Sequence, residues 1–106
     1  MSELSNPVAI FRDMVNKRGQ KLRTLNLHEL ELLANSPVEH LRIESRPAAI
    51  ALIVEQKAGG ELLVVLQGFI KARLVPFVKH VALDGFYKHL DGSVTPLSDE
   101  DTTRFD

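Results

Sequence analysis

The side chains best suited to chemistry are histidines and the aspartates close to two of them. His80 and His89 lie near Asp84 and Asp91 in the sequence. Zinc and iron sites need three or four such groups that converge, usually with histidines only a few residues apart. In this chain, the histidines are spaced further apart than in such sites. We therefore expect no metal site and no bound cofactor, and we interpret the histidines as surface or hydrogen-bonded residues.

Asp84 could also act as an acid or a base. It follows the apolar run Val81–Leu83 and precedes Gly85, and apolar surroundings can raise the pKa of a carboxyl group. Asp before Gly is also ordinary turn chemistry, in which the side chain binds local backbone N–H groups, and we favour this interpretation. Gly59 and Gly60 lack the spacing of a phosphate-binding loop, and no Gly-x-Ser-x-Gly sequence marks a nucleophile. The sequence does not point to an enzyme.

Length and composition indicate one domain without special chemistry. The 106 residues predict a single domain over residues 1–106. Without cysteine, disulfides and thiol chemistry are excluded. No apolar run approaches the roughly 18 residues that span a bilayer, so we expect a cytoplasmic location. Residues from about 98 to 106 are acidic, which predicts a solvated, partly frayed tail, although Ser98 with Asp101 has the pattern of a short last turn of helix.

Two clusters of basic residues raise the question of nucleic-acid binding. The net charge of −1 is far from the basic balance of a dedicated nucleic-acid binder. A faint helix-turn-helix pattern would place Glu39 and Glu44 against the phosphates. We therefore do not expect the chain to bind nucleic acid. The clusters comprise Arg12, Lys17, Arg18, Lys21 and Arg23, and Lys71, Arg73, Lys79 and His80.

The elements that must position these residues are organised around the stretch Pro47–Phe69. Two apolar runs, Ala48–Val54 and Leu62–Leu66, are joined by a loop that contains Gly59 and Gly60. Runs of this length, rich in Val, Ile and Leu and bounded by turn residues, predict a β-hairpin. Neither run alternates between apolar and polar residues, as a strand with one wet face does. Both faces of the hairpin must therefore be covered.

Two helices are predicted before the hairpin. Asn6 followed by proline is typical of a helix start, and this helix is expected to end just before Gly19. Asn26 begins a capping box and with it a second helix that ends at about Asn35. Residues 20–25 between them are interpreted as a connector or a short strand.

An antiparallel meander is predicted for the rest of the chain. An Asp-Gly pair between apolar runs is a strong hairpin signal, so we expect a turn at Asp91-Gly92. The pair Asp84-Gly85 predicts either another turn or a bulge within one longer strand. The fold class is then α+β, with two N-terminal helices packed on a curved sheet or half-barrel of five or six antiparallel strands. The predicted strands cover about residues 39–44, 48–54, 62–66, 77–83, 86–90 and 93–97. For residues 36–45 a helix is the alternative to a strand, because Ser36-Pro37 followed by Glu39 is also typical of a helix start.

The hairpin with two apolar faces suggests the function that we favour. If two helices cover one face of the sheet, a chain of this length has little left to cover the other. A second copy of the sheet, related by a two-fold axis, would supply the missing layer. We therefore predict a non-enzymatic interaction or regulatory module that forms a homodimer through its sheet and offers a surface to a protein partner. The predicted interface residues are Ile53, Val65, Phe69 and Phe77.

The alternative is a sheet that curls and leaves a cavity. The chain would then be a small-ligand-binding protein or a minor enzyme, with a pocket between the first helix and the curved sheet. The aromatic residues Phe69, Phe77, Phe86 and Tyr87 would line the interior of such a barrel, or lie at the dimer contact instead. The predicted polar contacts of the ligand are Arg73, His80, Asp84, Tyr87 and His89.

Overall fold

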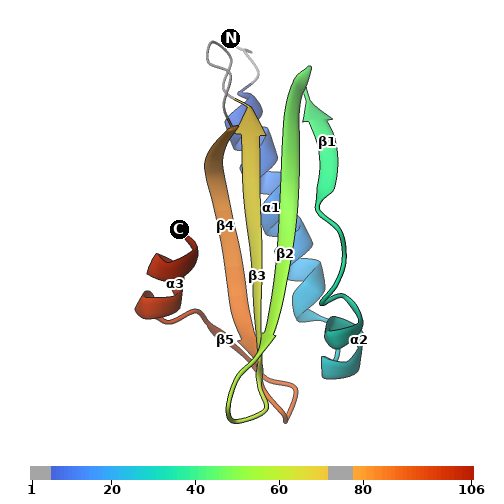
Figure 1. The fold of residues 1–106 in the computed structure, drawn as a ribbon, viewed down its shortest axis with the longest axis vertical. Helices are drawn as coiled ribbons and strands as arrows, with labels where there is room; N and C mark the ends of the chain where they lie inside the picture. Colours follow the sequence, from blue (N-terminus) through green and yellow to red (C-terminus); the bar gives the residue numbers. More distant parts are fainter. Residues whose placement is uncertain (1–5, 72–77) are drawn as a thin grey trace.

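The fold in the computed structural model is α+β, as predicted (Figure 1). The structure describes residues 6–71 and 78–106, with residues 78–80 described by their backbone alone. Its helices are α1 (Pro7–Arg23), α2 (Leu27–Leu32) and α3 (Asp99–Phe105). Its strands are β1 (Glu39–Ile43), β2 (Arg46–Gln56), β3 (Leu62–Lys71), β4 (Val78–Lys88) and β5 (Val94–Pro96). One detail of the prediction is corrected, because α3 lies at the C-terminal end and the helices are therefore not all N-terminal. The sheet of the described strands is not closed into a barrel.

The described strands form one antiparallel sheet in the order β1-β2-β3-β4-β5. The central strands β2, β3 and β4 are the long ones, and they pair over most of their length. By contrast, β1 pairs only with Arg46–Ile50 of β2, and β5 pairs only with Phe86–Lys88 of β4. Both edge strands are therefore short and cover only one end of the long strand beside them.

The turns show which of the two Asp-Gly pairs ends a strand. Gly92 has a φ of +89°, and Asp91-Gly92 joins β4 to β5 as predicted. The Ser93 hydroxyl donates a hydrogen bond to Asp91 Oδ1 and thereby lowers the pKa of that carboxyl group. Asp84-Gly85, however, lies inside β4, so a turn at this pair was the wrong alternative. The irregularity in this long strand pair is elsewhere, where the register shifts between Gly68 and Phe69.

The first helix is longer than predicted. Asn6 caps it, because its Oδ1 accepts hydrogen bonds from the backbone amides of the first turn at 3.1 and 3.2 Å. Gly19 does not end the helix but lies buried inside it. A Cβ atom at Gly19 would lie 1.5 Å from Oδ2 of Asp84, so the glycine makes room for that carboxylate. The predicted connector over residues 20–25 is consequently helix as far as Arg23.

The inner face of the sheet, defined as the face that α1 and α2 cover, carries the main core (Figure 1). Phe11 and Val15 of α1 are fully buried against it. Gly68 of β3 allows this close approach, because a Cβ atom there would lie 2.9 Å from the Phe11 ring. Leu30 of α2 is also fully buried, in a second cluster that includes Phe86. The predicted capping box of α2 is confirmed, although the helix ends at Leu32.

The opposite, outer face of the sheet is covered in part by α3. Ser98 caps this helix as predicted, and the C-terminal residues are not a frayed tail. Asp101 is only 5% exposed and accepts a hydrogen bond from the Tyr87 hydroxyl. The Gln67 side chain donates to the carbonyl of Phe105 at 2.8 Å. The premise that the chain has little left to cover the second face was therefore wrong for this part of the sheet.

Candidate ligand-binding groove and open sheet face

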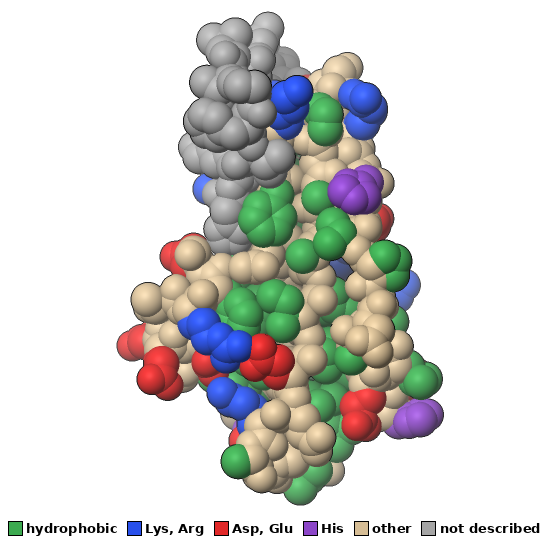
Figure 2. All heavy atoms as spheres, viewed as in Figure 1, with side chains coloured by type: hydrophobic (Ala, Val, Ile, Leu, Met, Phe, Trp, Pro, Cys, Tyr) green, Lys and Arg blue, Asp and Glu red, His purple; other side chains and the backbone are tan. Residues whose placement is uncertain are grey.

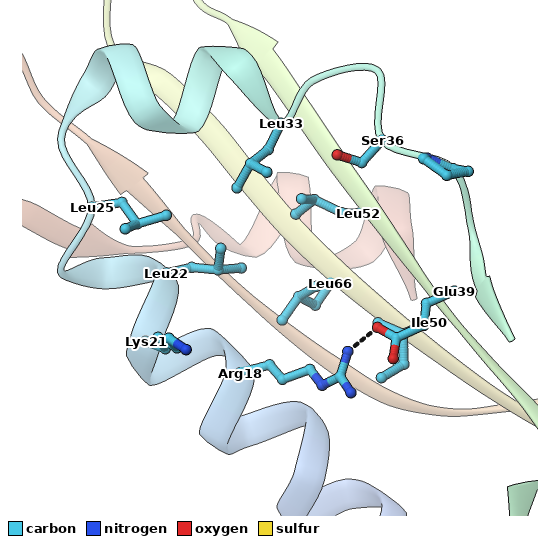
Figure 3. A pocket seen from close by; sticks show the side chains of 11 residues that line it. Arg18, Lys21, Leu22, Leu25, Leu33, Ser36, Glu39, Ile50, Leu52 and Leu66 are labelled. Carbon is cyan, nitrogen blue, oxygen red and sulfur yellow. Dashed lines mark hydrogen bonds and ion pairs between the residues drawn. The ribbon is translucent and has the colours of Figure 1, made fainter. Parts of the chain in front are cut away.

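A groove of about 540 Å³ opens between α1, α2 and the inner face of the sheet (Figure 3). It forms because α1 packs over β3 and β4, whereas α2 has only six residues and does not fill the space beside α1. Apolar side chains from five segments point into it, and most are leucines that stay partly exposed. These are Leu22, Leu25, Leu33, Ile50, Leu52 and Leu66.

The polar side chains of the groove come from α1, the segment after α2 and the start of β1. Arg18 and Lys21 lie one turn apart on α1. Figure 3 shows Arg18 extended toward Glu39, with which it forms an ion pair. Ser36 contributes a hydroxyl from the α2–β1 segment. The groove thus combines an apolar interior with two cations and one carboxylate.

Asp84, the predicted acid or ligand contact, serves to hold α1 to the sheet. Its carboxylate accepts two hydrogen bonds from Arg23, at 2.8 and 3.0 Å. The same guanidinium donates to the carbonyl of Gly85 and lies 4.8 Å from the centre of the Phe86 ring. Lys88 completes this contact, because its ammonium group donates to the carbonyl of Arg23 at the end of α1. Asp84 is thus part of the helix–sheet contact and does not line the groove.

The other predicted ligand contacts are not gathered around Asp84. Tyr87 lies an odd number of residues further along β4 and therefore on the opposite face, where it contacts α3. His89 hydrogen-bonds the hydroxyl of Thr95 at 2.7 Å in the β4–β5 hairpin. Arg73 and the side chain of His80 lie outside the described residues.

The outer face keeps an open apolar part beyond α3. Figure 2 shows hydrophobic side chains across the middle of this face and a group of acidic and basic side chains around α3. Ile53 and Phe69, two of the predicted interface residues, are half-buried here. Val65 is fully buried within the chain and cannot contribute to an interface, whereas Phe77 lies outside the described residues. Phe86 lies in the inner core, so it does not share this face with Tyr87.

The basic cluster near the end of α1 contains the groove cations that sequence reasoning did not assign to a site. Arg12 donates to the carbonyl of Val81 at 2.7 Å, and Arg23 binds Asp84, so both have structural roles. Arg18 and Lys21 are the members that line the groove. Their i, i+3 spacing on a helix was the available signal, but it was hidden by the expected helix end at Gly19.

Comparisons with known proteins do not assign this site. No protein-family model, curated protein or solved structure matches the chain. Among the described side chains, those of residues 6–71 and 81–106, no three from His, Asp or Glu converge in a way that could hold a metal ion. In the same part of the chain, no helix has the length and apolar character that a membrane crossing requires.

Proposed function

We propose that this chain is a non-enzymatic binding protein that holds a small, largely apolar molecule in the groove beside α1. The observation that carries the proposal is the set of partly exposed leucines, among them Leu22, Leu33 and Leu52, that point into one space. Small-molecule sites are mostly apolar and have volumes of roughly 300–1,000 Å³, and about 540 Å³ lies within this range. Covering these leucines would be favourable by about 25 cal/mol per Å² of apolar surface.

Two aspartates that could be considered as acids or bases, Asp84 and Asp101, are held in structural contacts, which supports a binding role without catalysis. Asp84 is held by Arg23 at the contact between α1 and the sheet. Asp101 accepts from Tyr87 and lies 3.3 Å from the ammonium group of Lys57, on the outer face. Neither carboxylate lines the groove. We propose a cytoplasmic location with this function, on the same grounds of composition as above.

Fluorescence titration with the neutral apolar probe N-phenyl-1-naphthylamine tests this function. We expect the probe to bind the wild-type chain, and Ser36→Phe, which places a ring in the groove, to weaken binding about tenfold. Val38→Phe is the matched control, because Val38 belongs to the same segment, is 47% exposed and does not line the groove. Equal binding by both variants, or no binding by wild type, would exclude the groove as the site.

A second candidate function is the homodimeric interaction module, which the open part of the outer face favours. Ala51 and Ile53 of β2 lie there without being fully covered by the chain. An antiparallel sheet with such a face can pack on a second copy about a two-fold axis. Light scattering across a concentration series should then show a dimer that Ala51→Glu dissociates. A monomer at high micromolar concentration would exclude this assembly.

A further inference from the structure

We propose that the ligand of the groove is an aliphatic carboxylate, whose acid group binds Arg18 and Lys21 while its chain lies among the leucines. This inference rests on the proposed function and names the ligand class for the same site. The lining of the groove carries an excess of positive charge. Two cations and one carboxylate leave one positive charge in excess, which a single ligand carboxylate neutralises. A neutral or cationic ligand would leave that charge unbalanced.

The two cations are placed to act together. Residues three apart on a helix are neighbours on its surface, so Arg18 and Lys21 present their charges on the same side of α1. Lys21 has no hydrogen-bond or ion-pair partner for its ammonium group among residues 6–71 and 81–106, whose side chains the structure describes. Arg guanidinium groups bind carboxylates through paired, charge-assisted hydrogen bonds. Together they provide more donors than Glu39 alone uses.

Glu39 shows where the acid group of a ligand would lie. Its carboxylate is already paired with Arg18 at the edge of the groove (Figure 3). The side chains of Arg18 and Glu39 are 39% and 47% exposed, and ion pairs this exposed contribute little to stability. A ligand carboxylate can therefore replace Glu39 as the partner of Arg18 at little cost to the fold. Glu39 then acts as a competitor that a ligand must displace.

The apolar part of the groove orients the rest of the ligand. Leu22, Leu33 and Leu52 come from α1, the end of α2 and β2. Figure 3 shows Leu33 and Leu52 across the groove from Arg18 and Lys21 of α1. The lining therefore has two cations along α1 and an apolar wall opposite them around Leu33 and Leu52. A linear amphiphile with one acid group matches this division, whereas a compact polar metabolite would leave the leucines uncovered.

Displacement of N-phenyl-1-naphthylamine by decanoate and by decanol tests the ligand class. These two compounds share an aliphatic chain and differ in charge. In the wild-type chain we expect decanoate to displace the probe at about a tenfold lower concentration than decanol. In Arg18→Gln combined with Lys21→Gln the two compounds should become equal within about twofold. Glu39→Gln should strengthen decanoate binding, because it removes the competing carboxylate, and leave decanol unchanged.

Lys17→Gln is the matched control for the loss of positive charge. Lys17 lies on the same helix, is paired with Asp13 and does not line the groove, so this variant should keep the preference for decanoate. If wild type binds the probe but decanol competes as well as decanoate, the ligand class is wrong and the proposed function stands. Failure of wild type to bind the probe would overturn the proposed function and this inference together.

Discussion

The two faces of the sheet are covered by different kinds of contact. On the inner face, α1 buries Phe11 and Val15 completely. On the outer face, α3 is less than half as long and is held mainly by polar contacts, among them those of Tyr87 and Gln67. Apolar burial is non-directional and grows with area, whereas a net hydrogen bond contributes only about 1 kcal/mol. We therefore expect the inner layer to determine global stability and α3 to undock on its own.

The largest effect should come from removing an aromatic ring on the inner face. Phe11→Ala leaves a cavity where the ring packs against Gly68 and should cost about 3–5 kcal/mol. Phe105→Ala, at a half-buried position of α3, should cost only about 1 kcal/mol, since less apolar surface is lost. Urea denaturation followed by circular dichroism measures both. Equal losses would contradict the proposed difference between the faces.

Gly19→Ala should have the next largest effect. Alanine normally stabilises a helix interior by about 1 kcal/mol relative to glycine. Here the new methyl group would meet the Asp84 carboxylate and force it away from Arg23. Loss of this partly buried pair should outweigh the gain in helix propensity and give a net cost of about 1–2 kcal/mol.

A double-mutant cycle separates these two contributions. In an Asp84→Ala background the space beside Gly19 is free, so Gly19→Ala should become neutral or stabilising by up to about 1 kcal/mol. Denaturant midpoints of the four proteins provide the test. If Gly19→Ala is equally destabilising in both backgrounds, the close approach of Asp84 is not its cause.

Acid should release α3 before it unfolds the rest of the chain. The Tyr87 hydroxyl, and then Lys57, lower the pKa of Asp101 below its ordinary value of 3.8. A lowered pKa in the folded state means that ionised Asp101 stabilises the docked helix above about pH 4. That contribution is lost as the pH falls through the lowered pKa. Tyr87 is the single tyrosine and the chain has no tryptophan, so intrinsic fluorescence reports this contact directly.

The fluorescence titration has an internal control in the two perturbed aspartates. A phenol that donates to a carboxylate emits weakly, so emission should rise with a midpoint below pH 3.8 in wild type. Asp101→Asn should remove this transition. Asp91→Asn should leave it unchanged, because Asp91, whose pKa is also lowered, interacts with Ser93 and not with Tyr87. A transition that survives Asp101→Asn would show that another group controls the docking of α3.

The sequence predicted local elements well where one signal acts alone. The caps at Asn6, Asn26 and Ser98 depend on a few neighbouring residues, and all three are confirmed. Gly19 was misinterpreted because a glycine that ends a helix and one that admits a side chain look alike in sequence. Only the partner, Asp84, distinguishes them, and it lies 65 residues away in the chain.

The groove could not be predicted because it depends on how helices lie on the sheet. The expectation of a pocket between helix and sheet was general, but the predicted contacts came from the segment around β4. Alternation along a strand already places Asp84 and Tyr87 on opposite faces, so they could not share one pocket. Arg18 and Lys21 could be matched to Glu39 only once α1 was known to extend past Gly19.

The smallest effect should come from an exposed ion pair of α3, and it refines the comparison of the two faces. Glu55 of β2 pairs with Arg104, and their side chains are 38% and 48% exposed. Glu55→Gln should lower global stability by less than about 1 kcal/mol, yet it should speed hydrogen exchange in α3, because few contacts hold that helix.

Asp13→Asn is the control, because it removes a still more exposed ion pair with Lys17 on α1. This variant should change neither the global stability nor the hydrogen exchange of α3. High salt should abolish the effect of Glu55→Gln, since it screens exposed charges. A loss from Glu55→Gln as large as that from Gly19→Ala would mean that α3 is part of the global folding unit.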